Sequence, residues 1–288
     1  MIPAAFEYHR PASLDEALQL LQRLPDAKLL AGGHSLLPMM KLRVVSPPHV
    51  IDLGRLEELR GIREEPGRIV IGALTTHWEI ESSGLMREKV PLFAETATRI
   101  GDVQVRNAGT VGGSLVHADP AADYPATVLV LEAEMVALGP KGPRVIPARG
   151  FFTGVLTSAV APDEVLTEVR VPVPSRGTGT AYLKFAHPAS GFAVVGVAAW
   201  VRRGGGRFEE VRVALTGVGP TAYRARGVEQ ALVGQAADEG TIAAAAEHAA
   251  DGVEANEDVF AAAPYRSHLA RVFTKRALRA ALERAGGD

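Results

Sequence analysis

Two glycine-rich segments hold the residues of this chain whose types and spacing best suit the binding of an anion. Residues 31–35 (AGGHS) follow a short apolar run, and residues 110–114 (TVGGS) lie further along the chain. Adjacent glycines allow positive φ values and let a ligand approach peptide N–H groups without an intervening side chain. Consecutive N–H groups that point inward form a concave anion site without any lysine, so each segment could hold a phosphate.

A diphosphate has two linked anionic centres, and two N–H-rich loops that converge on it would suit that chemistry. A short helix that begins at Ser35 would add a favourable potential for phosphate at the first loop. Asp123, which follows the second loop, could accept a hydrogen bond from a ribose or ribityl hydroxyl. Each glycine pair taken alone is also what an ordinary turn after a strand requires.

Other motifs in the chain are explained more simply as turns than as further binding or catalytic sites. Residues 217–222 fit the G-x-G-x-x-A pattern of a dinucleotide-binding turn, but Pro220 removes an N–H from that turn. Neither the second strand of a βαβ unit nor an acidic residue for ribose follows, which predicts a structural turn. His117, Asp119 and Asp123 contain metal-ligating atoms, but their spacing matches no metal motif and favours a turn. The scattered histidines have no triad partner, so hydrolysis lacks support.

Composition and charge exclude several classes of function. The 288 residues suffice for two domains, and the formal net charge of −2 includes no basic stripe for nucleic acid or anionic lipid. The chain contains no cysteine, which excludes disulfides, thiolate zinc sites and cysteine-ligated iron–sulfur clusters within it. The first ten residues lack the pattern of a secretory signal, and the apolar runs are too short to span a bilayer. We therefore expect a cytoplasmic protein without a membrane span.

The hydrophobic pattern predicts an α+β fold. Ser13 and Glu16 form an S-x-x-E capping box before a helix that should stop near Pro25. Further helices are expected at residues 76–99, 222–233, 239–251 and 262–284. Strands are expected at residues 27–30, 49–53, 68–71, 129–138, 144–147, 165–171, 181–185, 193–202 and 208–216, with a hairpin turn at 204–206. A linker is expected at residues 172–179, between a mixed N-terminal region and a C-terminal region of three strands followed by helices.

The ordered set of motifs resembles a known family. Residues 31–43 (AGGHSLLPMMKLR), the second loop and the D-P-x-x-D pattern at residues 119–123 are similar to the medium, FAD-binding subunit of the xanthine dehydrogenase and aerobic carbon monoxide dehydrogenase group of molybdenum hydroxylases. Ser114 departs from members of that group that carry asparagine there, which would alter one hydrogen bond. Three further segments resemble the same subunit, so the likeness covers nearly the whole chain: residues 6–21, 217–226 and 264–278.

The resemblance implies a PCMH-type FAD-binding fold, like that of vanillyl-alcohol oxidase. The FAD-binding domain would comprise residues 1–176, with subdomains at about 1–57 and 58–176. Residues 177–288 would form a C-terminal domain of the kind found in carbon monoxide dehydrogenase flavoproteins. That domain is expected to contain a three-stranded antiparallel sheet with helices.

The resemblance also implies which residues bind FAD, with no catalytic residue and no metal site in this chain. The two glycine-rich loops would hold the diphosphate, and Asp123 a hydroxyl of the ribityl or ribose portion. Lys184 would place a cation beside the N1–C2 edge of the flavin, and Phe192 would shield one face of the isoalloxazine ring. A solvated lysine on a strand and a core aromatic stay open as alternatives for these two. The complete set is Ala31, Gly32, Gly33, His34, Ser35, Ile100, Thr110, Val111, Gly112, Gly113, Ser114, Asp123, Leu166, Lys184 and Phe192.

The resemblance further implies a division of labour with partner chains. A large chain with a molybdenum cofactor would oxidise the substrate, and a small chain with two 2Fe–2S clusters would relay electrons to FAD, in a heterotrimer or a dimer of heterotrimers. FAD would pass the electrons to an external acceptor such as a quinone or NAD. The absence of cysteine agrees with this division, because the clusters must then lie in another chain. Two alternatives stay open: a self-contained FAD oxidase or reductase, and a non-catalytic assembly module with a vestigial flavin site.

Overall fold

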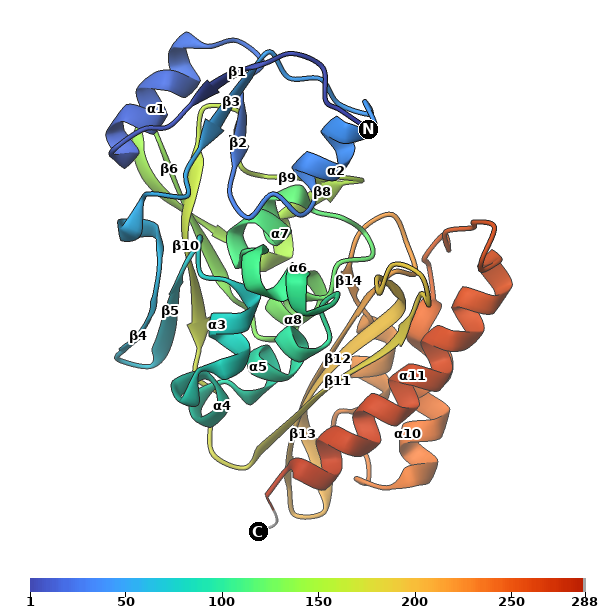
Figure 1. Ribbon diagram of the computed structural model, residues 1–288. Coiled ribbons are helices and arrows are strands. Elements are labelled where there is room, and N and C mark those ends of the chain that lie inside the picture. The colour runs from blue at the N-terminus through green and yellow to red at the C-terminus, as the bar shows by residue number, and fades with distance from the viewer. Residues whose placement is uncertain (287–288) are drawn as a thin grey trace.

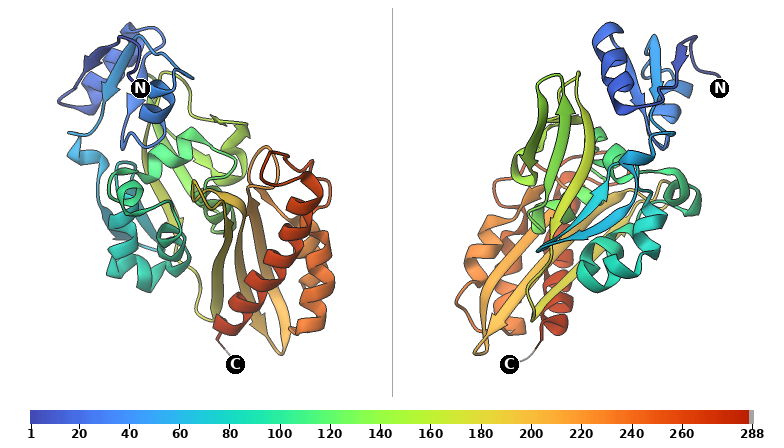
Figure 2. Two further views of the ribbon diagram at one scale, coloured as in Figure 1. Left: turned by 45° about the vertical axis from the view of Figure 1, so that its right-hand side comes forward. Right: turned by 90° about the vertical axis from the view of Figure 1, so that its left-hand side faces the viewer.

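The computed structural model describes residues 1–286, which form three main sheets with helices between and around them (Figure 1). The first sheet has the strand order β1-β3-β2, with both pairings parallel. Its elements are β1 (Glu7–His9), α1 (Leu14–Arg23), β2 (Lys28–Leu30), α2 (Leu36–Lys41) and β3 (His49–Asp52). Figure 2 shows that this small N-terminal unit projects from one end of the molecule.

The second sheet is antiparallel and has the order β4-β5-β10-β6-β7. Its strands are β4 (Ile62–Glu65), β5 (Arg68–Gly72), β6 (Glu134–Gly139), β7 (Gly142–Pro147) and β10 (Val165–Pro172). A run of helices connects β5 to β6: α3 (His77–Ser82), α4 (Gly84–Lys89), α5 (Pro91–Thr98), α6 (Val103–Ala108), α7 (Val111–His117) and α8 (Tyr124–Val130). The short pair β8 (Phe152–Gly154) and β9 (Thr157–Ser158) and two 3-10 turns, Glu57–Leu59 and Ala148–Gly150, complete this region.

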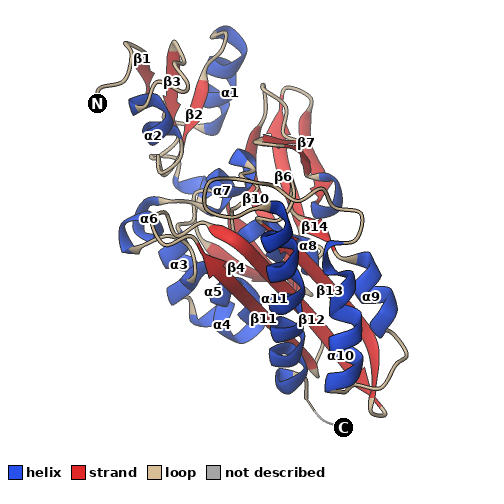
Figure 3. Ribbon diagram, turned by 90° about the vertical axis from the view of Figure 1, so that its right-hand side faces the viewer, coloured by secondary structure: helices blue, strands red, loops and turns tan. Residues whose placement is uncertain are grey.

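The third sheet is antiparallel, with the order β11-β12-β13-β14. Its strands are β11 (Thr178–Ala186), β12 (Ala193–Gly204), β13 (Arg207–Thr216) and β14 (Tyr223–Arg224). Helices α9 (Arg226–Leu232), α10 (Glu239–Ala246) and α11 (Ala263–Arg284), with the 3-10 turn Glu247–Ala250, follow the strands in sequence. Figure 3 shows these three helices on one face of the sheet, with α11 lying along β11 and β12.

Strand β12 is buried on both faces, which explains its unbroken apolar sequence. Side chains alternate between the two faces of a strand, so successive residues enter different environments. Ala198 and Trp200 join the core formed by the second sheet and helices α5 and α8. Val197 and Ala199 join the core beneath α9–α11. The third sheet therefore packs against the middle of the molecule as well as against its own helices.

The predicted α+β class is confirmed, and several predicted elements needed correction. The single helix expected at 76–99 is three helices, because Ser83 caps α4 with extended backbone and Pro91 begins α5. The strand expected at 129–138 is the end of α8 followed by β6, with a left-handed residue, Glu132, between them. The helix expected at 222–233 begins at Arg226, since Tyr223 and Arg224 form β14. That strand makes the C-terminal sheet four-stranded rather than three-stranded.

Other local predictions agree with the structure. The Ser13 side chain accepts a hydrogen bond from the Glu16 N–H, although the Glu16 carboxylate returns to Ala12 rather than to Ser13. The turn between β12 and β13 contains Gly205 and Gly206 at φ values of 54° and 70°, as the favoured two-residue hairpin turn requires. Over residues 1–286, no helix combines the length and the apolar character needed to cross a membrane.

Candidate functional site

A cavity of about 730 Å³ lies where the three sheets approach one another. This volume is within the range of about 300–1,000 Å³ that is usual for small-molecule and cofactor sites. The end of β2 and the first glycine-rich loop form one wall, and the start of α7 forms another. Further lining residues come from the segment 156–164, from β10 and from two rim loops, around Ile100 and Phe192.

The first glycine-rich loop presents a row of unpaired peptide N–H groups to this cavity. Leu30 ends β2, and Gly33 takes a φ of +75°, which turns the chain into α2 without a Cβ penalty. The N–H groups of residues 32–36 donate to no acceptor within residues 1–286. Because buried or half-buried backbone donors normally have partners, this row is suited to an anionic ligand. The loop therefore has the free donors that a phosphate site requires, and its binding of phosphate stays a prediction.

The two glycine-rich segments are in direct contact, and Gly32 makes that contact possible. A Cβ added to Gly32 would lie 2.0 Å from the carbonyl oxygen of Ala108 and 2.7 Å from the Cα of Gly109. These residues immediately precede the second loop, so the sequence places a glycine where two backbones meet. The convergence that the diphosphate hypothesis requires is present.

The second loop is the first turn of α7, and the N–H groups of residues 111–114 are already paired. Val111 donates to Thr75 and Gly112 to Ala73, while Gly113 and Ser114 donate to the hydroxyl and the carbonyl of Thr110. The expectation of a second free N–H row was therefore wrong, because Thr110 caps the helix itself. Gly112 has a packing role, since a Cβ there would lie 2.6 Å from the Ala73 side chain.

The second loop still contributes to the cavity wall. Thr110, Gly112, Gly113 and Ser114 line it, and the Ser114 hydroxyl has no partner in the described part of the chain. Gly113 is exposed toward the cavity. The structure places Val111 outside the lining, with its side chain fully buried in the core of the middle region.

Asp123 lies at the cavity wall in a buried cluster with two residues of β11. Its carboxylate accepts from the Tyr182 hydroxyl at 2.5 Å and lies 2.9 Å from the Lys184 Nζ. Burial raises the pKa of Asp123 to about 6, and the Lys184 ammonium and the Tyr182 hydroxyl oppose that rise. Burial likewise raises the pKa of Tyr182, so this phenol stays protonated and donates.

Lys184 points into this cluster and does not line the cavity. Its ammonium group donates to the carbonyl oxygens of Arg99 and Gly191 as well as to Asp123, which uses its three N–H donors. The Lys184 ammonium, which was expected beside the flavin edge, is thus already paired with Asp123. The alternative interpretation, a solvated lysine on a strand, is also wrong because this side chain is buried. Lys184 instead joins the two rim loops of the cavity.

The remaining expected residues lie at the cavity. Ile100, Leu166 and Phe192 all line it, and Phe192 is 43% exposed at the rim rather than a core aromatic. The rim loops touch each other, since a Cβ on Gly191 would lie 3.4 Å from the Cα of Gly101.

His77 is a lining residue that sequence reasoning missed. It is buried on α3 beneath Gly109, and burial lowers its pKa to about 3, so its ring is neutral. Its Nδ1 has no hydrogen-bond partner among the described residues. The helix-capping pair Thr76 and Glu79 around it is readable in the sequence, but nothing in the sequence shows that this turn faces the cavity.

The alternative motifs take the structural roles expected of them. Gly217 has a φ of +82° and donates to the Pro120 carbonyl, while Arg266 donates to its carbonyl oxygen, so this turn is filled by the protein itself. His117, Asp119 and Asp123 do not form a metal-ligand cluster; within residues 1–286, only Glu7, His9 and His49 bring three such groups together. Asp119 accepts from the Ala121 N–H, as in a turn.

The fold and the cavity define a class: a domain with an anion-binding loop and a cofactor-sized cavity, joined to an α+β C-terminal region. Residues 4–174 match the model of the FAD binding domain in molybdopterin dehydrogenase, and residues 180–281 match the carbon monoxide dehydrogenase flavoprotein C-terminal domain. The carbon monoxide dehydrogenase medium chain of Hydrogenophaga pseudoflava is 46% identical over 285 residues, covering 99% of each chain. The glyceraldehyde dehydrogenase medium chain of Sulfolobus acidocaldarius is 35% identical, covering 97% of this chain and 99% of that one.

A solved structure of the carbon monoxide dehydrogenase from Hydrogenophaga pseudoflava superimposes with a TM-score of 0.97 at 47% identity, covering 99% of this chain and 100% of that one. The chain described here belongs to the family of FAD-binding medium subunits of molybdenum hydroxylases, the xanthine dehydrogenase and aerobic carbon monoxide dehydrogenase group. It is an oxidoreductase subunit with FAD as its cofactor.

Proposed function

We propose that the first glycine-rich loop binds the FAD diphosphate. The observation that carries this assignment is the row of N–H groups at residues 32–36, which have no acceptor among the described residues and face a cavity of cofactor size. Among the described lining residues, Lys28 is the only lysine or arginine, so peptide dipoles would meet most of the negative charge. Ala31 precedes this row, His34 lies within it, and both line the cavity wall.

The other lining residues would hold the rest of the cofactor. Ser114 would donate to the diphosphate from the second loop, and Asp123 would accept from a ribityl or ribose hydroxyl through its remaining lone pairs. Ile100, Leu166 and Phe192 would contact the rings. Val111 and Lys184 would act from behind the wall, as a core residue and as a clamp on the rim loops.

We propose that this subunit relays electrons between two partners. When bound, FAD supplies the ability to take up electrons one or two at a time. The chain has no cysteine, so the 2Fe–2S clusters and the molybdenum cofactor would lie in a small and a large partner chain. The residues of this chain would orient the cofactor and leave the rim by Phe192 accessible to an external acceptor. We also propose a domain boundary at residues 176–177, between β10 and β11.

The diphosphate assignment is tested by titrating the flavin-free full chain with FAD, FMN and riboflavin. FMN lacks the second phosphate and the adenosine, so it should bind at least about 100-fold more weakly than FAD, from the loss of one or two charge-assisted hydrogen bonds. Flavin fluorescence measures each affinity. Equal affinities for FAD and FMN would contradict the assignment.

The electron route separates this proposal from its two alternatives. The relay predicts that substrate reduces the flavin only when the two partner chains are present, and that the chain co-purifies with molybdenum and iron. A self-contained oxidase would reduce its flavin with substrate when alone. An assembly module with a vestigial site would be colourless after gentle purification.

A further inference from the structure

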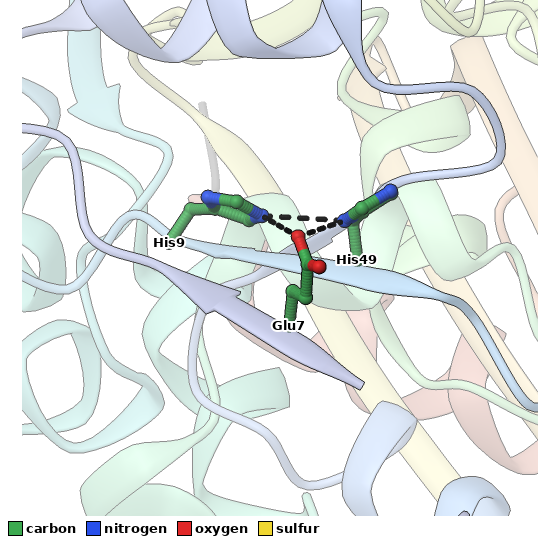
Figure 4. Close-up of side chains that lie close together, drawn as sticks. All are labelled: Glu7, His9 and His49. Carbon is green, nitrogen blue, oxygen red and sulfur yellow. Dashed lines mark hydrogen bonds and ion pairs between the residues drawn. The ribbon is translucent and has the colours of Figure 1, made fainter. Parts of the chain in front are cut away.

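Two histidines and a glutamate come together on the N-terminal sheet (Figure 4). None of the three lines the cavity that we assign to the flavin. Glu7 and His9 lie two residues apart on the edge strand β1, and therefore on the same face. His49 begins β3 and is the register partner of Glu7 in the parallel pairing. The Glu7 N–H also donates to the Pro48 carbonyl at 2.8 Å, which fixes this register beside the cluster.

The separations of the three ligand atoms match those around a zinc ion. The Glu7 Oε2 lies 3.3 Å from the His49 Nδ1 and 3.8 Å from the His9 Nε2, and the two ring nitrogens are 3.3 Å apart. The point in the plane of these atoms that is equidistant from all three lies about 2.0 Å from each, so an ion displaced slightly from the plane toward a fourth ligand has bonds of about 2.1 Å, the usual length of Zn–N and Zn–O bonds. Tetrahedral ligands at such bond lengths are themselves about 3.3 Å apart.

The cluster is accessible to solvent, so water can supply a fourth ligand. The side chain of Glu7 is 72% exposed, whereas those of His9 and His49 are 24% and 18% exposed. The half-buried imidazoles are held by the strands, and the carboxylate closes the group from the solvent side. Two imidazoles and one carboxylate suit zinc, nickel or copper rather than magnesium or calcium, which prefer oxygen ligands.

We propose that Glu7, His9 and His49 form a binding site for a divalent transition-metal ion of the zinc class, with water as the fourth ligand. The ion ties the edge strand β1 to the central strand β3. Its position on the sheet that carries the first glycine-rich loop makes it a structural site, separate from the flavin cavity.

The test uses the untagged full chain, freed of metal with a chelator, and titration with zinc chloride followed by calorimetry. We expect one zinc ion per chain with a dissociation constant of about 10⁻⁶ M or lower. Loss of an outer-shell partner already costs about 10–100-fold in metal affinity, so His9→Ala and His49→Ala should each weaken binding at least tenfold. Cobalt(II) should give the visible absorption bands typical of a four-coordinate ion, and these bands should be absent in both variants.

His248→Ala is the matched control, because His248 pairs with one carboxylate, Asp251, without a third ligand. It should leave zinc binding unchanged. Far-UV circular dichroism and bound flavin check that each variant is folded. Failure of the wild-type chain to bind zinc stoichiometrically overturns the proposal, as does a His9→Ala, His49→Ala double variant that binds like the wild type. Neither result bears on the FAD assignment, which concerns other residues.

Discussion

The contact between the two glycine-rich segments gives the sharpest prediction, which is the substitution Gly32→Ala. The new methyl group would lie 2.0 Å from the Ala108 carbonyl oxygen, so the two backbones must separate by more than about 1 Å. A displacement of about 1 Å takes a normal N–H···O hydrogen bond of about 2.9 Å beyond bonding range. The first loop would thereby lose at least one donor to the FAD diphosphate.

The size of the effect follows from that lost donor. A hydrogen bond to a charged group contributes about 1.5–3 kcal/mol, so the affinity for FAD should fall about 10- to 150-fold. The overpacking itself should cost about 1–3 kcal/mol of unfolding free energy in the flavin-free chain. Fluorescence titration with FAD gives the first quantity, and urea unfolding of the flavin-free chain gives the second.

Gly179→Ala is the matched control, because the same kind of clash occurs there away from the cavity. A Cβ on Gly179 would lie 1.9 Å from the Ala281 carbonyl oxygen, where β11 meets α11. It should cost a similar unfolding free energy but leave FAD affinity within about twofold, since no donor to the diphosphate moves. If Gly32→Ala lost stability and kept its FAD affinity, the reasoning about the N–H row would be refuted. If both variants lost FAD equally, the effect would be one of general destabilisation.

Three further predictions concern buried or cross-region charges. Lys184→Met should raise the pKa of Asp123 further above about 6, because the ammonium group opposes the effect of burial. A buried carboxyl with a raised pKa destabilises the fold once it is ionised, so the variant should lose more unfolding free energy relative to the wild type as the pH rises from 5 to 8, toward about 3–5 kcal/mol. Urea unfolding at each pH measures this difference. The wild type should lose up to roughly 5 kcal/mol of unfolding free energy as the pH falls from 6.5 toward 3, because the folded state resists protonation of His77 in that window, and His77→Gln should lack this loss. A parallel pH dependence of the unfolding free energy in the two proteins would contradict this. Arg284→Ala removes contacts with Glu95 and should cost only about 1 kcal/mol in thermal or urea unfolding, because the arginine is half exposed.

Much of the fold could be predicted from hydrophobic patterns and turn residues, and the errors have definite physical causes. The pattern does not distinguish one long helix from three short ones, because Ser83 and Pro91 restart the helix without changing its apolar spacing. The apolar run after Tyr124 is compatible with either a buried helix or a buried strand. Only its packing beneath the third sheet determines that it is a helix. Strand β14 has two residues, too few for any pattern.

The candidate site shows the same limit at the level of single atoms. The glycine pairs were readable, but their different roles were not, because these depend on which acceptors lie nearby. Within residues 1–286 the N–H groups of the first loop have no acceptor, whereas the carbonyls of Ala73 and Thr75, in the turn after β5, accept from the second loop. Lys184 was expected to face the flavin, but it faces Asp123. A buried carboxylate without a charged partner would destabilise the fold, which favours this pairing. A pairing across 61 residues of sequence has no local signal.

The cavity depends on the C-terminal region as much as on the glycine-rich loops. The Thr216 hydroxyl at the end of β13 lies 2.7 Å from the carbonyl oxygens of Pro120 and Ala122, and β11 supplies both partners of Asp123. The segment that follows the second loop is therefore held by the third sheet, and so is the rim loop that contains Gly191. Because these contacts are made by buried polar groups, removing the sheet would leave several of them unpaired at once. We therefore expect binding of the cofactor to be coupled to docking of the C-terminal region through the same few hydrogen bonds.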